Sequence, residues 1–191
     1  MKNAVKKTAY LFTSLLALFL VACGGYTTVN LGGSVNGLIT SGLVIANAGQ
    51  TMTVPINATS YVFPNKIDDH GSYAITIQAQ PPRLTCIVSG SAGVTTGIAI
   101  NSANIYCSLN SYAVGGTITG LTNEGLSLTN GADNLTIAGN TSIFTMPLPV
   151  ADGTVFGVAI LSQPAGQTCT LKNGTSTMGA AAVTNIAITC I

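Results

Sequence analysis

The chain has 191 residues, of which 47% are hydrophobic and only 6% are charged. Six lysines and arginines oppose five aspartates and glutamates, and three of the basic residues lie within the first seven positions. Beyond residue 22, three basic side chains (Lys66, Arg83 and Lys172) remain against five carboxylates, a net charge of −2. So few positive charges leave no basic patch to neutralise phosphates, which excludes nucleic acid as a partner.

The first 22 residues have the three parts of a bacterial export signal, and we expect them to form a signal-peptide helix. Their apolar stretch, Ala9–Leu20, is too short to span a bilayer core, which needs about 20 residues. Leu20-Val21-Ala22-Cys23 then resembles the lipobox of bacterial lipoproteins. The resemblance implies that Cys23 is diacylated and becomes the first mature residue. Because Gly24 is not an aspartate, it also implies the outer membrane. The alternative is an ordinary cleaved signal peptide in which the cysteine is accidental.

The rest of the chain is an internal duplication with an offset of 83 residues. Gly32-Gly33-Ser-Val-Asn-Gly-Leu38 returns as Gly115-Gly116-Thr-Ile-Thr-Gly-Leu121, and residues 32–107 share 19 identities with residues 115–190 without a gap. Both cysteine pairs keep the same offset, which chance does not explain. We expect a lipidated tether at 23–31, repeat 1 at 32–108, a short linker at 109–114 and repeat 2 at 115–191.

Both repeats are predicted to be all-β, because Val, Ile and Leu alternate with Thr, Ser and Asn and no convincing 3.6-residue period occurs. In repeat 1 the pattern predicts strands at 34–38, 43–46, 52–56, 60–63, 72–79, 84–88 and 103–108. In repeat 2 it predicts strands at 117–121, 126–129, 134–138, 142–146, 154–161, 167–171 and 185–191.

Seven short strands with glycine-rich turns favour a small antiparallel β-sandwich in each repeat. The two-residue period places Tyr73, Ile75 and Ile77, and likewise Phe156, Val158 and Ile160, on the inward face of a central strand. An aromatic strand after a turn, as in Gly71–Ile75 and Asp152–Phe156, resembles immunoglobulin-like and prealbumin-like modules of secreted bacterial proteins. The resemblance covers residues 32–191.

Four cysteines remain once Cys23 is lipidated, and four cysteines allow three pairings. The duplication favours Cys86 with Cys107 and Cys169 with Cys190, since a pairing between repeats would not be equivalent in two copies of one fold. Disulfides require an oxidising compartment, in agreement with export. A metal site is disfavoured because the cysteines of each repeat are 21 residues apart with no histidine beside them. We therefore expect neither a metal nor another cofactor.

Catalytic chemistry has few candidates in this chain. The one histidine, His70, follows Asp68 and Asp69, which suggests a carboxylate–imidazole pair or a polar turn. Because repeat 2 keeps the turn residues and loses the histidine, we favour the turn. Asp133 lies in a loop that could help to bind calcium, but one carboxylate is insufficient. Four Asn-x-Ser/Thr triplets begin at Asn57, Asn134, Asn140 and Asn173, and we interpret them as accidental.

These observations predict a non-enzymatic lipoprotein, anchored to the outer membrane through Cys23 on the periplasmic face or at the cell surface, with a structural or adhesive role. One alternative is a module that binds cell-surface or extracellular polysaccharide. The other is an accessory subunit that binds an envelope protein. Carbohydrate-binding surfaces favour exposed aromatic residues; this chain has no Trp, and its candidates are Tyr26, Tyr61, Tyr106 and Tyr112.

Overall fold

A computed structural model describes residues 27–191 of the chain, and this range is all-β, without a helix. The predicted fold class is thereby confirmed for these residues. The expected signal-peptide helix, the lipobox and Tyr26 lie outside the described residues. Within residues 27–191 no helix is long and apolar enough to cross a membrane.

Each repeat contains ten strands. Those of repeat 1 are β1 (Thr28–Val29), β2 (Gly32–Asn36), β3 (Val44–Asn47), β4 (Gln50–Thr53), β5 (Ser60–Val62), β6 (Ile67–Asp68), β7 (Ser72–Ala79), β8 (Leu84–Ser89), β9 (Ala92–Val94) and β10 (Asn104–Leu109). Those of repeat 2 are β11 (Ser111–Tyr112), β12 (Val114–Thr119), β13 (Leu126–Asn130), β14 (Asp133–Ile137), β15 (Ile143–Thr145), β16 (Val150–Ala151), β17 (Val155–Ser162), β18 (Cys169–Lys172), β19 (Thr175–Thr177) and β20 (Val183–Cys190).

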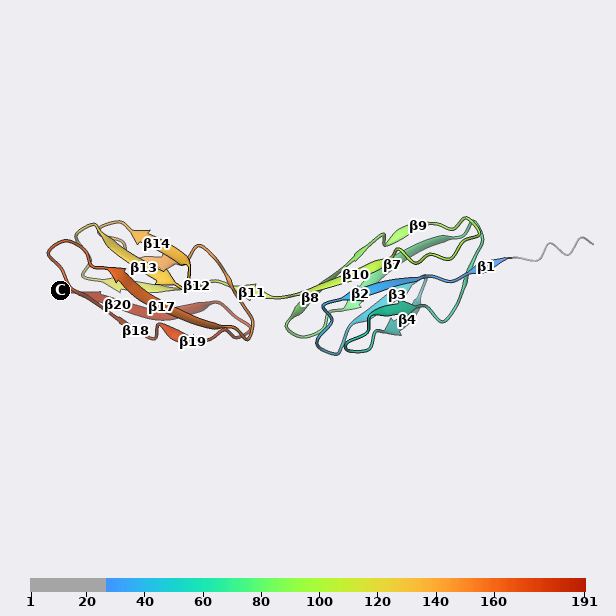
Figure 1. The fold of residues 1–191 in the computed structure, drawn as a ribbon, viewed down its shortest axis with the longest axis horizontal. Coiled ribbons are helices and arrows are strands. Elements are labelled where there is room, and N and C mark those ends of the chain that lie inside the picture. The colour runs from blue at the N-terminus through green and yellow to red at the C-terminus, as the bar shows by residue number, and fades with distance from the viewer. Residues whose placement is uncertain (1–26) are drawn as a thin grey trace, which may run out of the picture.

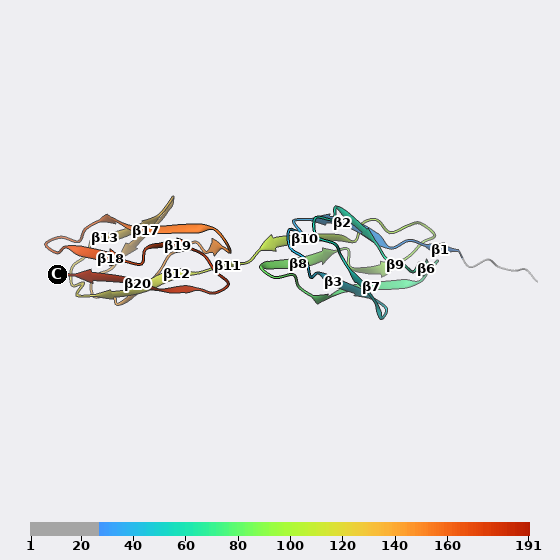
Figure 2. The ribbon, with the colours of Figure 1, turned by 90° about the horizontal axis from the view of Figure 1, so that it is seen from below.

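The two repeats share one topology. Repeat 1 pairs its strands as β5-β2-β10-β8 and β4-β3-β7-β9, and repeat 2 as β15-β12-β20-β18 and β14-β13-β17-β19. A two-stranded ribbon, β1-β6 or β11-β16, completes each unit. Figures 1 and 2 show the two units one after the other along the long axis, with the C-terminus at the end far from β1. The duplication inferred from the 83-residue offset is therefore a duplication of structure.

The cores follow the alternation of apolar and polar residues. Strands β7 and β17 have the same burial pattern, in which Tyr73 and Ile75, or Phe156 and Val158, are buried and their neighbours exposed. The third predicted inward residue, Ile77 or Ile160, is partly buried against the same core. Each repeat has its own hydrophobic cluster, so each buries its core without the other.

One strand pair in each repeat departs from the predicted antiparallel arrangement. Strands β2 and β10 are parallel, as are β12 and β20. Glycine permits this pairing, because a Cβ at Gly33 would overlap the carbonyl oxygen of Ala103, and one at Gly116 that of Ile186. The Gly-Gly pairs are thus within strands where two backbones approach closely.

The predicted boundaries of the tether and the linker also need correction. Strand β1 lies within the range predicted as tether and pairs antiparallel with β6, and β11 lies within the predicted linker and pairs with β16. Leu31 and Val114, from the same two ranges, are fully buried. Only Asn110 separates the end of β10 from the start of β11, so the repeats meet at that residue.

Candidate functional site

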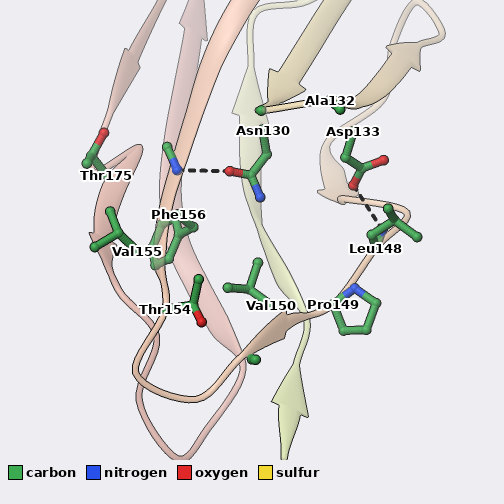
Figure 3. Close-up of a pocket in the computed structure, with 13 residues that line it drawn as sticks. Asn130, Ala132, Asp133, Leu148, Pro149, Val150, Thr154, Val155, Phe156 and Thr175 are labelled. Carbon is green, nitrogen blue, oxygen red and sulfur yellow. Dashed lines mark hydrogen bonds between the residues drawn. The ribbon is translucent and has the colours of Figure 1, made fainter. Parts of the chain in front are cut away.

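A groove occurs at the same place in both repeats. In repeat 2 it has a volume of about 570 Å³ and lies between the β13–β14 turn and the loop that precedes β17 (Figure 3). A smaller groove of about 270 Å³ occupies the equivalent place in repeat 1. Each residue that lines the smaller groove has its counterpart, 83 positions later, in the lining of the larger one. We call them the repeat-1 groove and the repeat-2 groove.

An asparagine at the back of each groove holds the surrounding strands together. Oδ1 of Asn47 accepts a hydrogen bond of 2.9 Å from the backbone N–H of Ala74. Oδ1 of Asn130 accepts the equivalent bond, also 2.9 Å, from Gly157, and Figure 3 shows the amide nitrogen of Asn130 directed toward the groove. The identity of Asn47 and Asn130 at the 83-residue offset is the signal in the sequence that could have located the grooves.

The walls of the two grooves differ in chemistry. The repeat-2 groove is lined by Leu148, Pro149, Val150 and Val155. Leu148 and Val155 remain 61% and 66% exposed, so apolar surface faces solvent here. The equivalent residues of the repeat-1 groove are Asn65, Lys66, Ile67 and Ser72. The repeat-2 groove therefore suits an uncharged or apolar group, and the repeat-1 groove a polar one.

The residues considered for catalysis and calcium binding, His70 and Asp133, make local contacts. His70 lies in a turn at φ 59°, with its side chain 80% exposed and Nδ1 3.1 Å from the Oδ2 atom of Asp69. Its counterpart Gly153 has a similar φ of 79°, which confirms the interpretation as a turn. Oδ2 of Asp133 accepts a 2.9 Å hydrogen bond from the N–H of Leu148 and so fixes the edge of the repeat-2 groove. Within residues 27–191 no three His, Cys, Asp or Glu residues are placed to hold a metal ion.

The remaining sequence candidates are explained by local conformation or burial. Three of the four Asn-x-Ser/Thr triplets begin with an asparagine at positive φ, a conformation that asparagine tolerates well: Asn57, Asn140 and Asn173. The fourth triplet begins in strand β14.

The tyrosines considered for sugar binding differ in exposure. Tyr61 is buried and Tyr112 packs against the core of repeat 2. Tyr106 is 46% exposed on the outer face of β10, opposite Ile87. Among the candidate tyrosines within residues 27–191, only Tyr106 has its ring exposed on an open sheet face.

Both predicted disulfides are present, Cys86–Cys107 and Cys169–Cys190. Each joins residues directly opposite one another on antiparallel strands, β8 with β10 and β18 with β20. Two structural disulfides are typical of proteins outside the cytoplasm.

Comparison with known proteins adds little to this description. No protein-family model matches the chain, and no curated protein matches it. Among solved structures, the Bacillus anthracis TIE protein is similar, with 12% sequence identity and a TM-score of 0.47. The similarity covers 86% of this chain and 34% of the TIE protein, so the chain spans about one third of that protein's length.

Proposed function

We propose that this protein is a lipoprotein of the bacterial outer membrane that projects two non-catalytic β-sandwiches from Cys23 and acts as a structural or adhesive module. The observation that carries the proposal is the tandem of two domains, each with its own internal disulfide, directly behind a lipobox-like sequence. The C-terminal unit lies at the end of the molecule opposite β1 (Figure 1), so repeat 2 points away from the anchor.

The anchor also sets the distance of repeat 1 from the membrane. Because β1 begins at Thr28, only residues 24–27 separate Cys23 from the first strand. Four extended residues reach at most roughly 14 Å. Repeat 1 is then held close to the lipid surface, and a partner reached from the anchored protein meets repeat 2 first.

Replacing the lipidated cysteine tests the anchoring. We expect Cys23→Ser to move the protein from the membrane fraction to the soluble fraction, because two or more acyl chains supply the membrane affinity. Fractionation of cells and labelling with a radioactive fatty acid measure the two consequences, and Gly25→Ser is the matched control that keeps the cysteine. If the unmodified protein took up no labelled fatty acid, or if Cys23→Ser took up as much as Gly25→Ser, the lipoprotein assignment would be wrong.

A polysaccharide is the second candidate ligand, and Tyr106 is the observation that favours it. In repeat 1 the ring lies on an open sheet beside Asn36, its partner in the parallel pairing, and Ile87. An aromatic face flanked by an amide suits a neutral sugar ring, and the sparse charge of the protein suits a neutral glycan.

A glycan array with the soluble protein tests this candidate function. We expect Tyr106→Ala to reduce any glycan signal at least tenfold, because the stacking face is removed. Thr189→Ala is the matched control, since Thr189 occupies the equivalent place in repeat 2. Absence of signal for the unmodified protein, or equal loss in both variants, would rule out Tyr106 as a sugar-binding residue and leave the adhesive or structural role.

A further inference from the structure

The two repeats meet through polar contacts around Asn110. The N–H of Asn110 donates to the carbonyl of Arg83 at 2.9 Å, and its own carbonyl accepts from the N–H of Asp152 at 2.8 Å. The hydroxyl of Thr85 donates to Oδ1 of Asn110 at 2.7 Å. Across the junction, Nε of Arg83 lies 3.1 Å from Oδ1 of Asp152. Repeat 1 thus contributes a cation and repeat 2 a carboxylate.

Arg83 has an unusual backbone conformation for its residue type. Its φ is 69°, in the left-handed region that costs a residue with a Cβ. At the equivalent position repeat 2 has Gly166, with φ 71°, which adopts this conformation freely. The duplicated fold therefore requires positive φ here, and repeat 1 meets the requirement with an arginine whose side chain reaches the neighbouring repeat. Backbone strain of this kind persists where the surrounding structure compensates for its cost.

Repeat 2 differs from repeat 1 at the residue that the Arg83 side chain contacts. Repeat 1 has His70 at φ 59° where repeat 2 has Gly153 at φ 79°. A Cβ on Gly153 would overlap the Nη2 atom of Arg83. The repeats have therefore diverged from their common pattern at two positions that meet across the junction, and the two changes are complementary in shape.

Arg83 supplies the counter-charge for the buried carboxylate of Asp152. The Asp152 side chain is only 7% exposed, and its Oδ2 atom has no hydrogen-bond partner among the described residues. The equivalent Asp69 is 25% exposed and instead pairs with its neighbour His70. Removing Arg83 would leave the Asp152 carboxylate buried without a counter-charge, which is strongly unfavourable. The carboxylate would then have to turn toward solvent, and the junction would open.

We propose that Arg83, Asp152 and Gly153 form a latch that holds the two repeats at one relative angle, so that they move as a single rigid body. The latch also fixes the repeat-2 groove, because Asp152 and Gly153 lie between Ala151 and Thr154, two residues of its lining. The relative placement of the two grooves is thereby set by one arginine.

Residual dipolar couplings measured on a soluble form of residues 24–191, which keeps all twenty strands, test the latch. A rigid pair gives one alignment tensor for both repeats, and a hinged pair gives two. We expect one tensor for the unmodified protein and two for Arg83→Gly, which places at this position the residue that repeat 2 has there. Lys172→Ala, which removes a cation from the outer face of β18, is the control and should keep one tensor.

A second variant tests the complementarity of shape. Gly153→His introduces the residue that repeat 1 has at this position, where His70 adopts a similar positive φ. The histidine should displace the Arg83 side chain and give two tensors. In the double variant Arg83→Gly/Gly153→His, the histidine should cause no further change, since its effect acts through Arg83. A single tensor for Arg83→Gly, two tensors for the unmodified protein, or additive effects in the double variant would each overturn the proposal.

Discussion

Replacement of both Cys169 and Cys190 by alanine is expected to lower the free energy of unfolding of repeat 2 by about 3 kcal/mol and to leave repeat 1 folded. The bridge closes a segment with a sequence separation of 21 residues between β18 and β20. Without it the unfolded chain gains the entropy that the cross-link removed. Alanine is preferred to serine because both sulfur-bearing residues are buried, and a buried hydroxyl without a partner would add its own cost.

Amide hydrogen exchange reports this loss separately for each repeat. The reciprocal variant, Cys86→Ala/Cys107→Ala, should move the loss to repeat 1, because the two cores are separate clusters. Equal loss of protection in both repeats, in either variant, would show that the chain unfolds as one cooperative unit. The latch would then stabilise the folded pair as well as orient it.

Repeat 1 is expected to lose about 2–3 kcal/mol of stability between pH 10 and pH 12, and repeat 2 is not. Burial raises the pKa of Tyr61 to about 12, with a smaller contribution from Tyr73 nearby. Its hydroxyl donates a 2.7 Å hydrogen bond to the carbonyl of Ala103. In the unfolded chain the phenol titrates near pH 10. The unfolded state therefore releases its proton first as the pH rises, and stability that is complete below pH 10 declines toward pH 12.

Denaturant unfolding at a series of pH values, followed by probes in each repeat, measures this difference. Tyr61→Phe removes the titrating group and should make repeat 1 insensitive to pH in this window, at the cost of the hydrogen bond. Phe144 occupies the equivalent position in repeat 2, so the chain carries its own control. A decline of the same size in both repeats, or one that persists in Tyr61→Phe, would assign the effect to general alkaline denaturation.

The two results bear on how the two repeats present their surfaces together. Each repeat has its own core and its own disulfide, and the two repeats meet at the junction around Asn110. A rigid pair presents the repeat-2 groove and the Tyr106 face in a constant orientation relative to each other. Constant orientation reduces the entropy lost when a partner binds both surfaces.

The all-β class, the duplication and the two disulfides could be predicted from the sequence. An offset of 83 residues maintained through both cysteine pairs left one equivalent pairing, and the two-residue period located the central strands β7 and β17. These features depend on residues close together in sequence or on the comparison of two copies, both of which are visible without coordinates.

The short strands, the parallel pairing, the grooves and the junction become visible only in the folded structure. Strands β1, β6 and β9 have two or three residues, too few for a period, and exist because a distant segment pairs with them. The Gly33 backbone lies against Ala103, 70 residues away in sequence, and Arg83 contacts Asp152. The direction of a strand pair and the chemistry of a groove or junction depend on which residues, distant in sequence, come into contact. Local patterns of hydrophobicity do not show which residues these are.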